Sequence, residues 1–130
     1  MLSNKLTLQA LMAGTALLAT TLAADARAQS VRSFDGPWSV MIVTDYGQCD
    51  RVYRFGVQIS DGRVSYEGGM GADVYGRVNP RGQVSVQVRQ GDHGASGTGR
   101  LTQVSGGGRW SGSSFNQQCG GHWIAQRREY

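Results

Sequence analysis

Apolar and polar residues alternate in short runs from about residue 35 to the end of the chain, and glycine-rich breaks separate these runs. Such alternation turns one set of side chains toward the inside of a sheet and the other toward solvent. The clearest run covers residues 83–89, where Val84, Val86 and Val88 alternate with polar residues. The pattern therefore predicts a single all-β domain over residues 35–130.

Eight runs of this kind are expected to form strands. They cover residues 38–44, 53–60, 63–67, 72–78, 83–89, 95–103, 109–113 and 121–128. Asp61-Gly62 and the segment Asn-Pro-Arg-Gly at 79–82 are strong turn signals between successive runs. Short connections between neighbouring strands predict an antiparallel meander.

The first 28 residues are expected to be a cleaved signal peptide. Lys5 supplies a positive start, residues 6–22 form an apolar stretch, and residues 26–28 (Ala-Arg-Ala) fit a cleavage site. The stretch is short and diluted compared with the ~20 apolar residues of a membrane helix, so we expect no membrane span. Residues 29–34 would then be a short N-terminal tail, and the mature protein would be periplasmic or secreted.

Cys49 and Cys119 are the only two cysteines of the chain, and export predicts that they form a disulfide. Cys49 falls in the loop after the first expected strand and Cys119 in the loop after the seventh, and in a meander both loops lie at the same end. A disulfide brings two Cα atoms within about 7 Å, so the first and last strands must be neighbours. This predicts an eight-stranded antiparallel up-and-down barrel, with a two-sheet β-sandwich as the alternative.

The disulfide end is expected to carry the longer and more varied loops. Functional residues tend to lie on loops that a rigid scaffold holds in place. The candidate surface for a ligand or partner consists of Tyr46, Asp50, Arg51, Asp92, His93, Phe115 and Asn116.

Glycines recur at positions expected to face the interior. Gly97 and Gly99 share one face of the sixth expected strand, and Gly76 and Gly112 hold similar positions on nearby strands. A glycine in a strand lets a bulky group approach closely. Either large aromatic side chains such as Trp123 fill this space or a small cavity remains, and we expect a packed interior.

Residues 36–38 (Gly-Pro-Trp) open the first strand, and Arg127-Arg128 close the last. This arrangement resembles the closing device of the calycin superfamily of small barrels, which includes avidins and lipocalins. The resemblance implies that Arg127 or Arg128 rests on the indole of Trp38 and plugs the barrel floor, a cation–π contact worth about 0.5–2 kcal/mol.

Motifs along most of the chain are similar to those of a set of small exported rhizobial proteins, some of which carry a haem-utilisation label. These motifs are CDRVYR (49–54), GRV (76–78), GTGRL (97–101), GRWSG (108–112) and CGGHWIAQR (119–127). For haem, His93 and His122 are the available axial ligands, and no Cys-x-x-Cys-His attachment motif is present. We therefore expect no cofactor and no metal, with a haem-associated role as a minor alternative.

Composition narrows the function further. The formal net charge is +4, and beyond residue 28 every basic residue is an arginine, but no arginine run exceeds Arg127-Arg128, so nucleic-acid binding is not expected. Asp92, His93 and Ser96 have the residue types of a catalytic triad, yet neighbours on one loop seldom orient one another, and no nucleophile motif is present. We do not expect an enzyme.

The prediction is a monomeric exported binding module for an unidentified small ligand or exported protein. The alternative is an inhibitor of a cell-wall enzyme. An apolar cavity above about 300 Å³ that opens at the disulfide end would favour the ligand carrier, whereas a filled interior with a protruding loop would favour the inhibitor.

Overall fold

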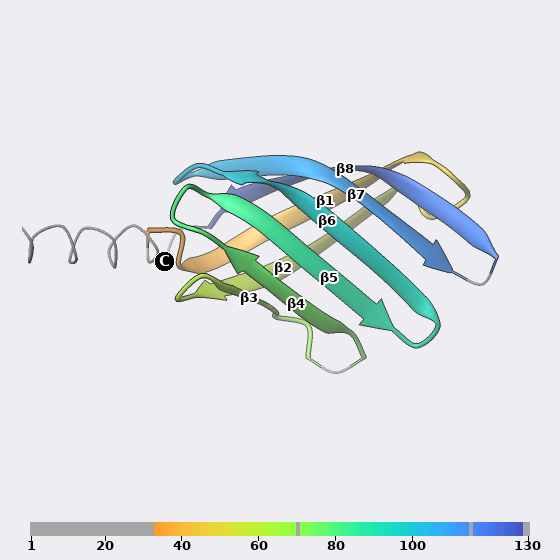
Figure 1. Cartoon of the computed structure of the whole chain (residues 1–130), viewed down its shortest axis with the longest axis horizontal. Coiled ribbons are helices and arrows are strands. Elements are labelled where there is room, and N and C mark those ends of the chain that lie inside the picture. The colour runs from red at the N-terminus through yellow and green to blue at the C-terminus, as the bar shows by residue number, and fades with distance from the viewer. Residues whose placement is uncertain (1–32, 70, 115, 129–130) are drawn as a thin grey trace, which may run out of the picture.

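The computed structural model describes residues 33–69, 71–114 and 116–128, so the expected signal peptide lies outside it. The described chain is all-β and forms one closed barrel in which each strand pairs with the next (Figure 1). The strands are β1 (Gly36–Tyr46), β2 (Val52–Ser60), β3 (Arg63–Tyr66), β4 (Asp73–Val78), β5 (Gln83–Gln90), β6 (His93–Leu101), β7 (Ser105–Ser114) and β8 (Gln117–Arg127). Nowhere in this part of the chain is a helix long and apolar enough to cross a membrane.

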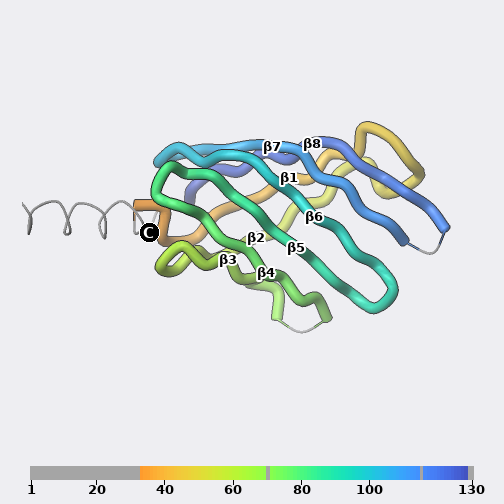
Figure 2. Tube along the Cα trace, viewed as in Figure 1, coloured from red at the N-terminus to blue at the C-terminus, as the bar shows by residue number. Residues whose placement is uncertain are grey.

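Closure of the barrel comes from β1, which pairs antiparallel with both β2 and β8. The first and last strands, far apart in sequence, therefore lie side by side (Figure 2). Cys49 and Cys119 form the expected disulfide, with their Cα atoms 6.1 Å apart. The eight-stranded barrel is confirmed, and the β-sandwich alternative is wrong.

The expectation that Cys119 lies in a loop is wrong as well, because β8 begins at Gln117. The first residues of β8 continue the ladder with β7, from Gln117 opposite Ser114 to Gly120 opposite Ser111. Glutamines, serines and glycines show no apolar alternation, so the pattern contained no signal for this part of the strand. Cys49 does lie in the β1–β2 loop, and both cysteines remain at the same end of the barrel.

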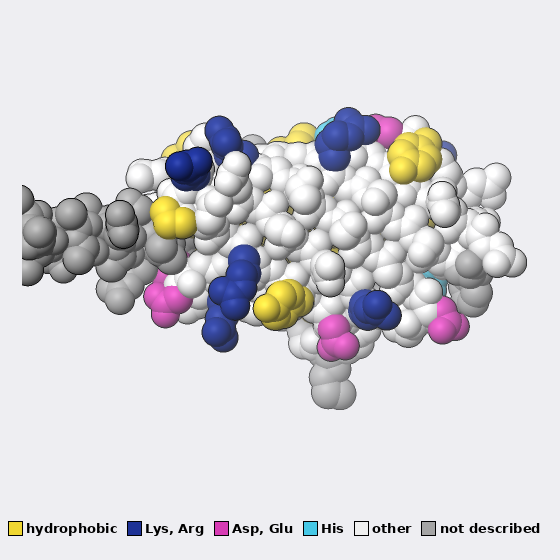
Figure 3. Space-filling model, in the orientation of Figure 1, with side chains coloured by type: hydrophobic (Ala, Val, Ile, Leu, Met, Phe, Trp, Pro, Cys, Tyr) yellow, Lys and Arg dark blue, Asp and Glu magenta, His cyan; other side chains and the backbone are white. Residues whose placement is uncertain are grey.

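Alternation along each strand decides which side chains face the interior. On β5, Val84 is buried and Val86 lines the interior, whereas Ser85 and Gln87 are exposed. The outer face shown in Figure 3 consists mainly of uncharged polar side chains and backbone, with hydrophobic side chains scattered singly. The barrel therefore has one apolar side, and that side points inward.

The connections after β1, β3, β5 and β7 lie at one end of the barrel, which we call the disulfide end; the opposite end we call the closed end (Figure 1). Most of the buried core belongs to the closed half. Its members there are Phe34, Trp38, Val57, Ile59, Val64, Val78, Val84, Leu101 and Ala125. Inward residues nearer the disulfide end, such as Ile42, Phe55 and Val74, are only partly buried.

Trp38 and Arg127 shut the closed end. Trp38 is 1% exposed, and its indole N–H donates to the carbonyl of Phe34 at 2.8 Å. The guanidinium of Arg127 lies 5.6 Å from the Trp38 ring centroid and donates to the backbone carbonyls of Ser33, Asp35 and Gln103. Of the two arginines considered, Arg127 is the one over the indole, since its Cα is the register partner of Trp38.

Candidate functional site: the barrel cavity

A cavity of about 330 Å³ lies inside the barrel. It extends from Trp38 at the closed end to His93 and Ser114 at the disulfide end. Between these limits its wall consists mainly of valines, together with the aromatic rings of Phe55, Trp110 and Trp123. No Asp, Glu, Lys or Arg side chain of the described residues is part of the lining.

The cavity differs from the packed interior expected above. The glycines do admit an aromatic ring, since a Cβ on Gly99 would lie 2.5 Å from the Trp123 ring. The ring stays at the wall, however, because its N–H donates to the Thr98 carbonyl at 3.1 Å. The facing wall carries valines such as Val74 and Val86, which are too short to reach the barrel axis.

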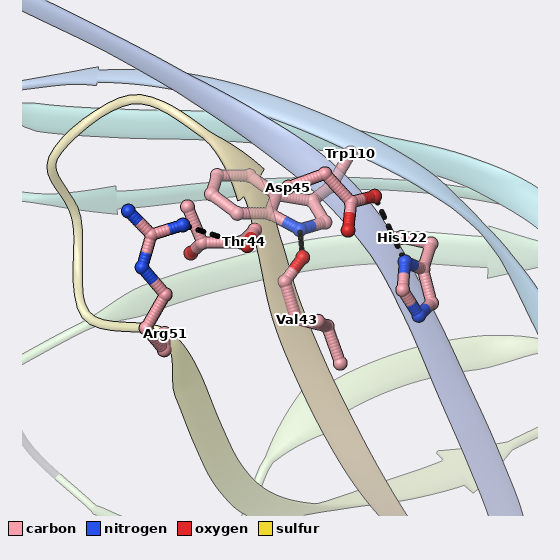
Figure 4. Close-up of polar contacts among 6 residues, drawn as sticks. All are labelled: Val43, Thr44, Asp45, Arg51, Trp110 and His122. Carbon is pink, nitrogen blue, oxygen red and sulfur yellow. Dashed lines mark hydrogen bonds and ion pairs between the residues drawn. The ribbon is translucent and has the colours of Figure 1, made fainter.

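Trp110 is held against the wall in the same way. Its indole N–H donates to the carbonyl of Val43 at 2.9 Å (Figure 4). β8 lies between the two residues, and it contributes Gly121 opposite Trp110. A Cβ at Gly121 would lie 2.0 Å from the Val43 carbonyl oxygen, so only glycine fits there.

The cavity opens at the disulfide end. Tyr53 lines the cavity and is 44% exposed at this end, on the part of β2 that pairs with β1 but not with β3. Gln90 and His93, on either side of the β5–β6 turn, also line the cavity and are exposed. At the closed end, by contrast, Trp38 is buried.

The β1–β2 loop is held to the barrel beside this mouth. The guanidinium of Arg51 donates to the carbonyls of Thr44 and Gly47, at 3.2 and 3.1 Å (Figure 4). Thr44 in turn donates its hydroxyl to the carbonyl of Asp50 at 2.6 Å. Arg51, one of the candidate contact residues, thus donates to Thr44 near the end of β1 and to Gly47 in the loop, and it does not line the cavity.

Tyr46 and His122 belong to the outer surface. Tyr46 is 52% exposed and its ring covers Gly120, at a position where a Cβ would meet the ring. The imidazole of His122 lies 2.9 Å from the carboxylate of Asp45 (Figure 4). Because β8 residues alternate between the two sides of the wall, His122 faces outward, whereas His93 faces the cavity.

The expected site residues are thus divided. His93 and the disulfide line the mouth, with Cys49 contributing to the cavity wall. Asp50, Asp92 and Asn116 are exposed at the disulfide end but do not line the cavity. Phe115 lies outside the described residues.

Sequence reasoning missed Tyr53, Gln90 and Ser114 as mouth residues. The period-two alternation could have identified them, because each lies two residues from another inward residue of its strand, at the disulfide end. The candidate surface consisted of residues expected in loops, whereas these three residues are the last inward positions of strands.

Ligation of a cofactor has little support in this geometry. The two histidines lie on opposite sides of the barrel wall, so they do not face a common space. Among the described residues no group of three or more His, Cys, Asp or Glu side chains could hold a metal ion.

The fold and the site define a class of protein: a closed eight-stranded antiparallel barrel with an apolar interior that opens at one end. No family model matches the chain, and comparisons with curated proteins and with solved structures gave no match. The similarity to small exported rhizobial proteins therefore stays a prediction.

Proposed function

We propose that this protein is an exported binding module that holds a small apolar ligand inside its barrel. The observation that supports this most is the cavity of about 330 Å³, lined by apolar side chains and open at the disulfide end. Ligand pockets usually range from ~300 to 1,000 Å³ and are mostly apolar. Transfer of apolar ligand surface out of water contributes about 25 cal/mol per Å², so such a wall favours binding without any charged contact.

The inhibitor of a cell-wall enzyme is the weaker proposal. A filled interior with a protruding loop would have favoured the inhibitor. Here the interior is hollow, and the β1–β2 loop is bonded to the barrel through the disulfide and Arg51. A binding role also agrees with the lack of charged side chains in the lining. Because each described strand pairs with a neighbour on both sides over at least part of its length, we propose that the protein acts as a monomer.

Tryptophan fluorescence offers a direct test, since all three tryptophans of the chain, Trp38, Trp110 and Trp123, line the cavity. The small uncharged fluorophore 1-aminonaphthalene should bind at a single site and quench them. Substitution Val86→Trp fills the cavity from β5 and should weaken the binding of this probe about tenfold or more, which corresponds to ~1.4 kcal/mol.

The matched control is Gln87→Trp, which adds the same side chain at the next, outward-facing position of the same strand. It should bind the probe as the unmodified protein does, and thermal unfolding should show that both variants fold. If the unmodified protein binds no apolar probe, or if both variants bind it equally, the cavity is not the binding site.

A further inference from the structure

The polar groups of the cavity gather at its mouth. Gln90, His93 and Ser114 occupy the last inward positions of β5, β6 and β7 at the disulfide end, and all three line the cavity. Below them the side chains of the wall are valines, aromatic rings and other apolar groups as far as Trp38. A molecule that matches this wall must be apolar along its length and polar at one end.

We propose that the ligand is a slender amphiphile with an uncharged polar head, and that the head lies at the mouth against Gln90, His93 and Ser114. This inference rests on the proposed function and names the chemistry and the orientation of its ligand.

The volume of the cavity limits the length of such a ligand. If each non-hydrogen atom takes about the volume of a water molecule in the liquid, ~30 Å³, a cavity of about 330 Å³ holds roughly eleven of them. That is one medium-length alkyl chain or one substituted ring with its head group. A two-chain lipid or a haem is far too large to enter.

The charges around the mouth favour an uncharged head. The guanidinium of Arg51 donates to the carbonyls of Thr44 and Gly47, and Arg89 lies on the outer side of β5 opposite Asp73. Asp50 and Asp92 are exposed at the same end. A carboxylate head would lose hydration without a facing cation, which makes its binding costly.

The geometry of the mouth suits a hydroxyl, ester or amide oxygen. Ser114 Oγ lies 3.5 Å from His93 Nε2, which is long for a hydrogen bond. An oxygen of the ligand can approach both groups from the cavity side, since a serine hydroxyl and an imidazole each donate or accept. The carboxamide of Gln90 supplies a further donor and acceptor at the β5–β6 turn.

The experiment compares the displacement of 1-aminonaphthalene by three compounds of similar size: 1-nonanol, nonanoate and n-butylbenzene. They carry an uncharged polar head, an anionic head and no head, respectively. We expect 1-nonanol to displace the probe at concentrations about tenfold lower than the other two, as one or two added hydrogen bonds would give.

Variants at the mouth test whether the polar head of the ligand binds there. In His93→Ala/Ser114→Ala, and to a smaller extent in Ser114→Ala alone, 1-nonanol should bind about tenfold more weakly while n-butylbenzene is unaffected. Ser111→Ala, an outward position of β7, is the control and should change neither.

The outcomes separate the two proposals. If nonanoate or n-butylbenzene competes as well as 1-nonanol, or if the mouth variants weaken all compounds equally, the inference about the head is wrong and the apolar cavity site stands. If neither the probe nor any of the compounds binds, the proposed function fails as well.

Discussion

Two adjacent arginines near the end of the chain have different roles. Arg127 lies over Trp38 and donates to three backbone carbonyls around the closed end. Arg128 pairs with the carboxylate of Glu67 on the outer surface, where both side chains are partly exposed. Arg127, the last residue of β8, therefore closes the barrel, whereas its neighbour Arg128 belongs to a solvent-screened ion pair.

Substitution Arg127→Gln should lower the free energy of unfolding by roughly 1–3 kcal/mol, since it removes the cation–π contact and the donor of two partly buried carbonyls and one exposed carbonyl. Arg128→Gln should cost only about 0–1 kcal/mol, as expected for an exposed pair. Urea unfolding followed by circular dichroism measures both values. Equal losses in the two variants would contradict the assignment of Arg127 as the floor residue.

Among the strands, β3 has the weakest seam. It has four residues, and its register with β4 includes only two residue pairs. One of these pairs places Arg63 directly opposite Arg77, and both are exposed. Like charges directly opposite each other on neighbouring strands are unfavourable, so this pairing weakens a short ladder further.

Substitution Arg77→Gln should therefore stabilise the barrel, by about 0.2–1 kcal/mol at low ionic strength. The gain should nearly vanish in 1 M salt, where the Debye length falls to about 3 Å. Thermal unfolding at the two salt concentrations tests this. Arg100→Gln, opposite Gln83 on the same sheet, is the control for net charge, and an equal gain in that variant would argue against cross-strand repulsion.

At the scale of the whole molecule, the disulfide and the β1–β8 ladder both close the barrel. The disulfide joins residues 70 apart in sequence, whereas the ladder joins β1 and β8 through eight residue pairs. Because neither cysteine belongs to the residue pairs of the β1–β8 ladder, we expect the disulfide to act mainly on the unfolded chain. The barrel is then expected to survive its reduction.

The double variant Cys49→Ala/Cys119→Ala should lose about 4 kcal/mol of unfolding free energy in the chain-entropy account of such a loop. Its far-UV spectrum at room temperature should stay that of a β-barrel, and it should still bind the apolar probe. Urea unfolding of the variant and of the oxidised protein measures the difference. Loss of the β spectrum would mean that the ladder cannot close the barrel alone.

Much of this architecture was predictable from the order of residues. The period-two pattern identified the inward valines of β5, and the two cysteines together with strand parity implied that β1 and β8 are neighbours. These two features depend on local alternation and on chain topology, both of which are written directly in the sequence. The closing pair of Trp38 and a terminal arginine was expected only from the resemblance to calycin barrels.

Only the tertiary structure decided the register of the strands, the side of the barrel wall on which a residue such as Tyr46 lies, and the volume of the cavity. The choice of Arg127 over Arg128 depends on the register of β1 with β8, and the outward position of Tyr46 follows a register shift between Thr44 and Tyr46. The cavity depends on how far inward side chains reach across a closed barrel. Alternation predicts that Val74 and Trp123 point inward. The space between them depends on the width of the barrel and on the hydrogen bond from Trp123 to Thr98, which alternation does not predict.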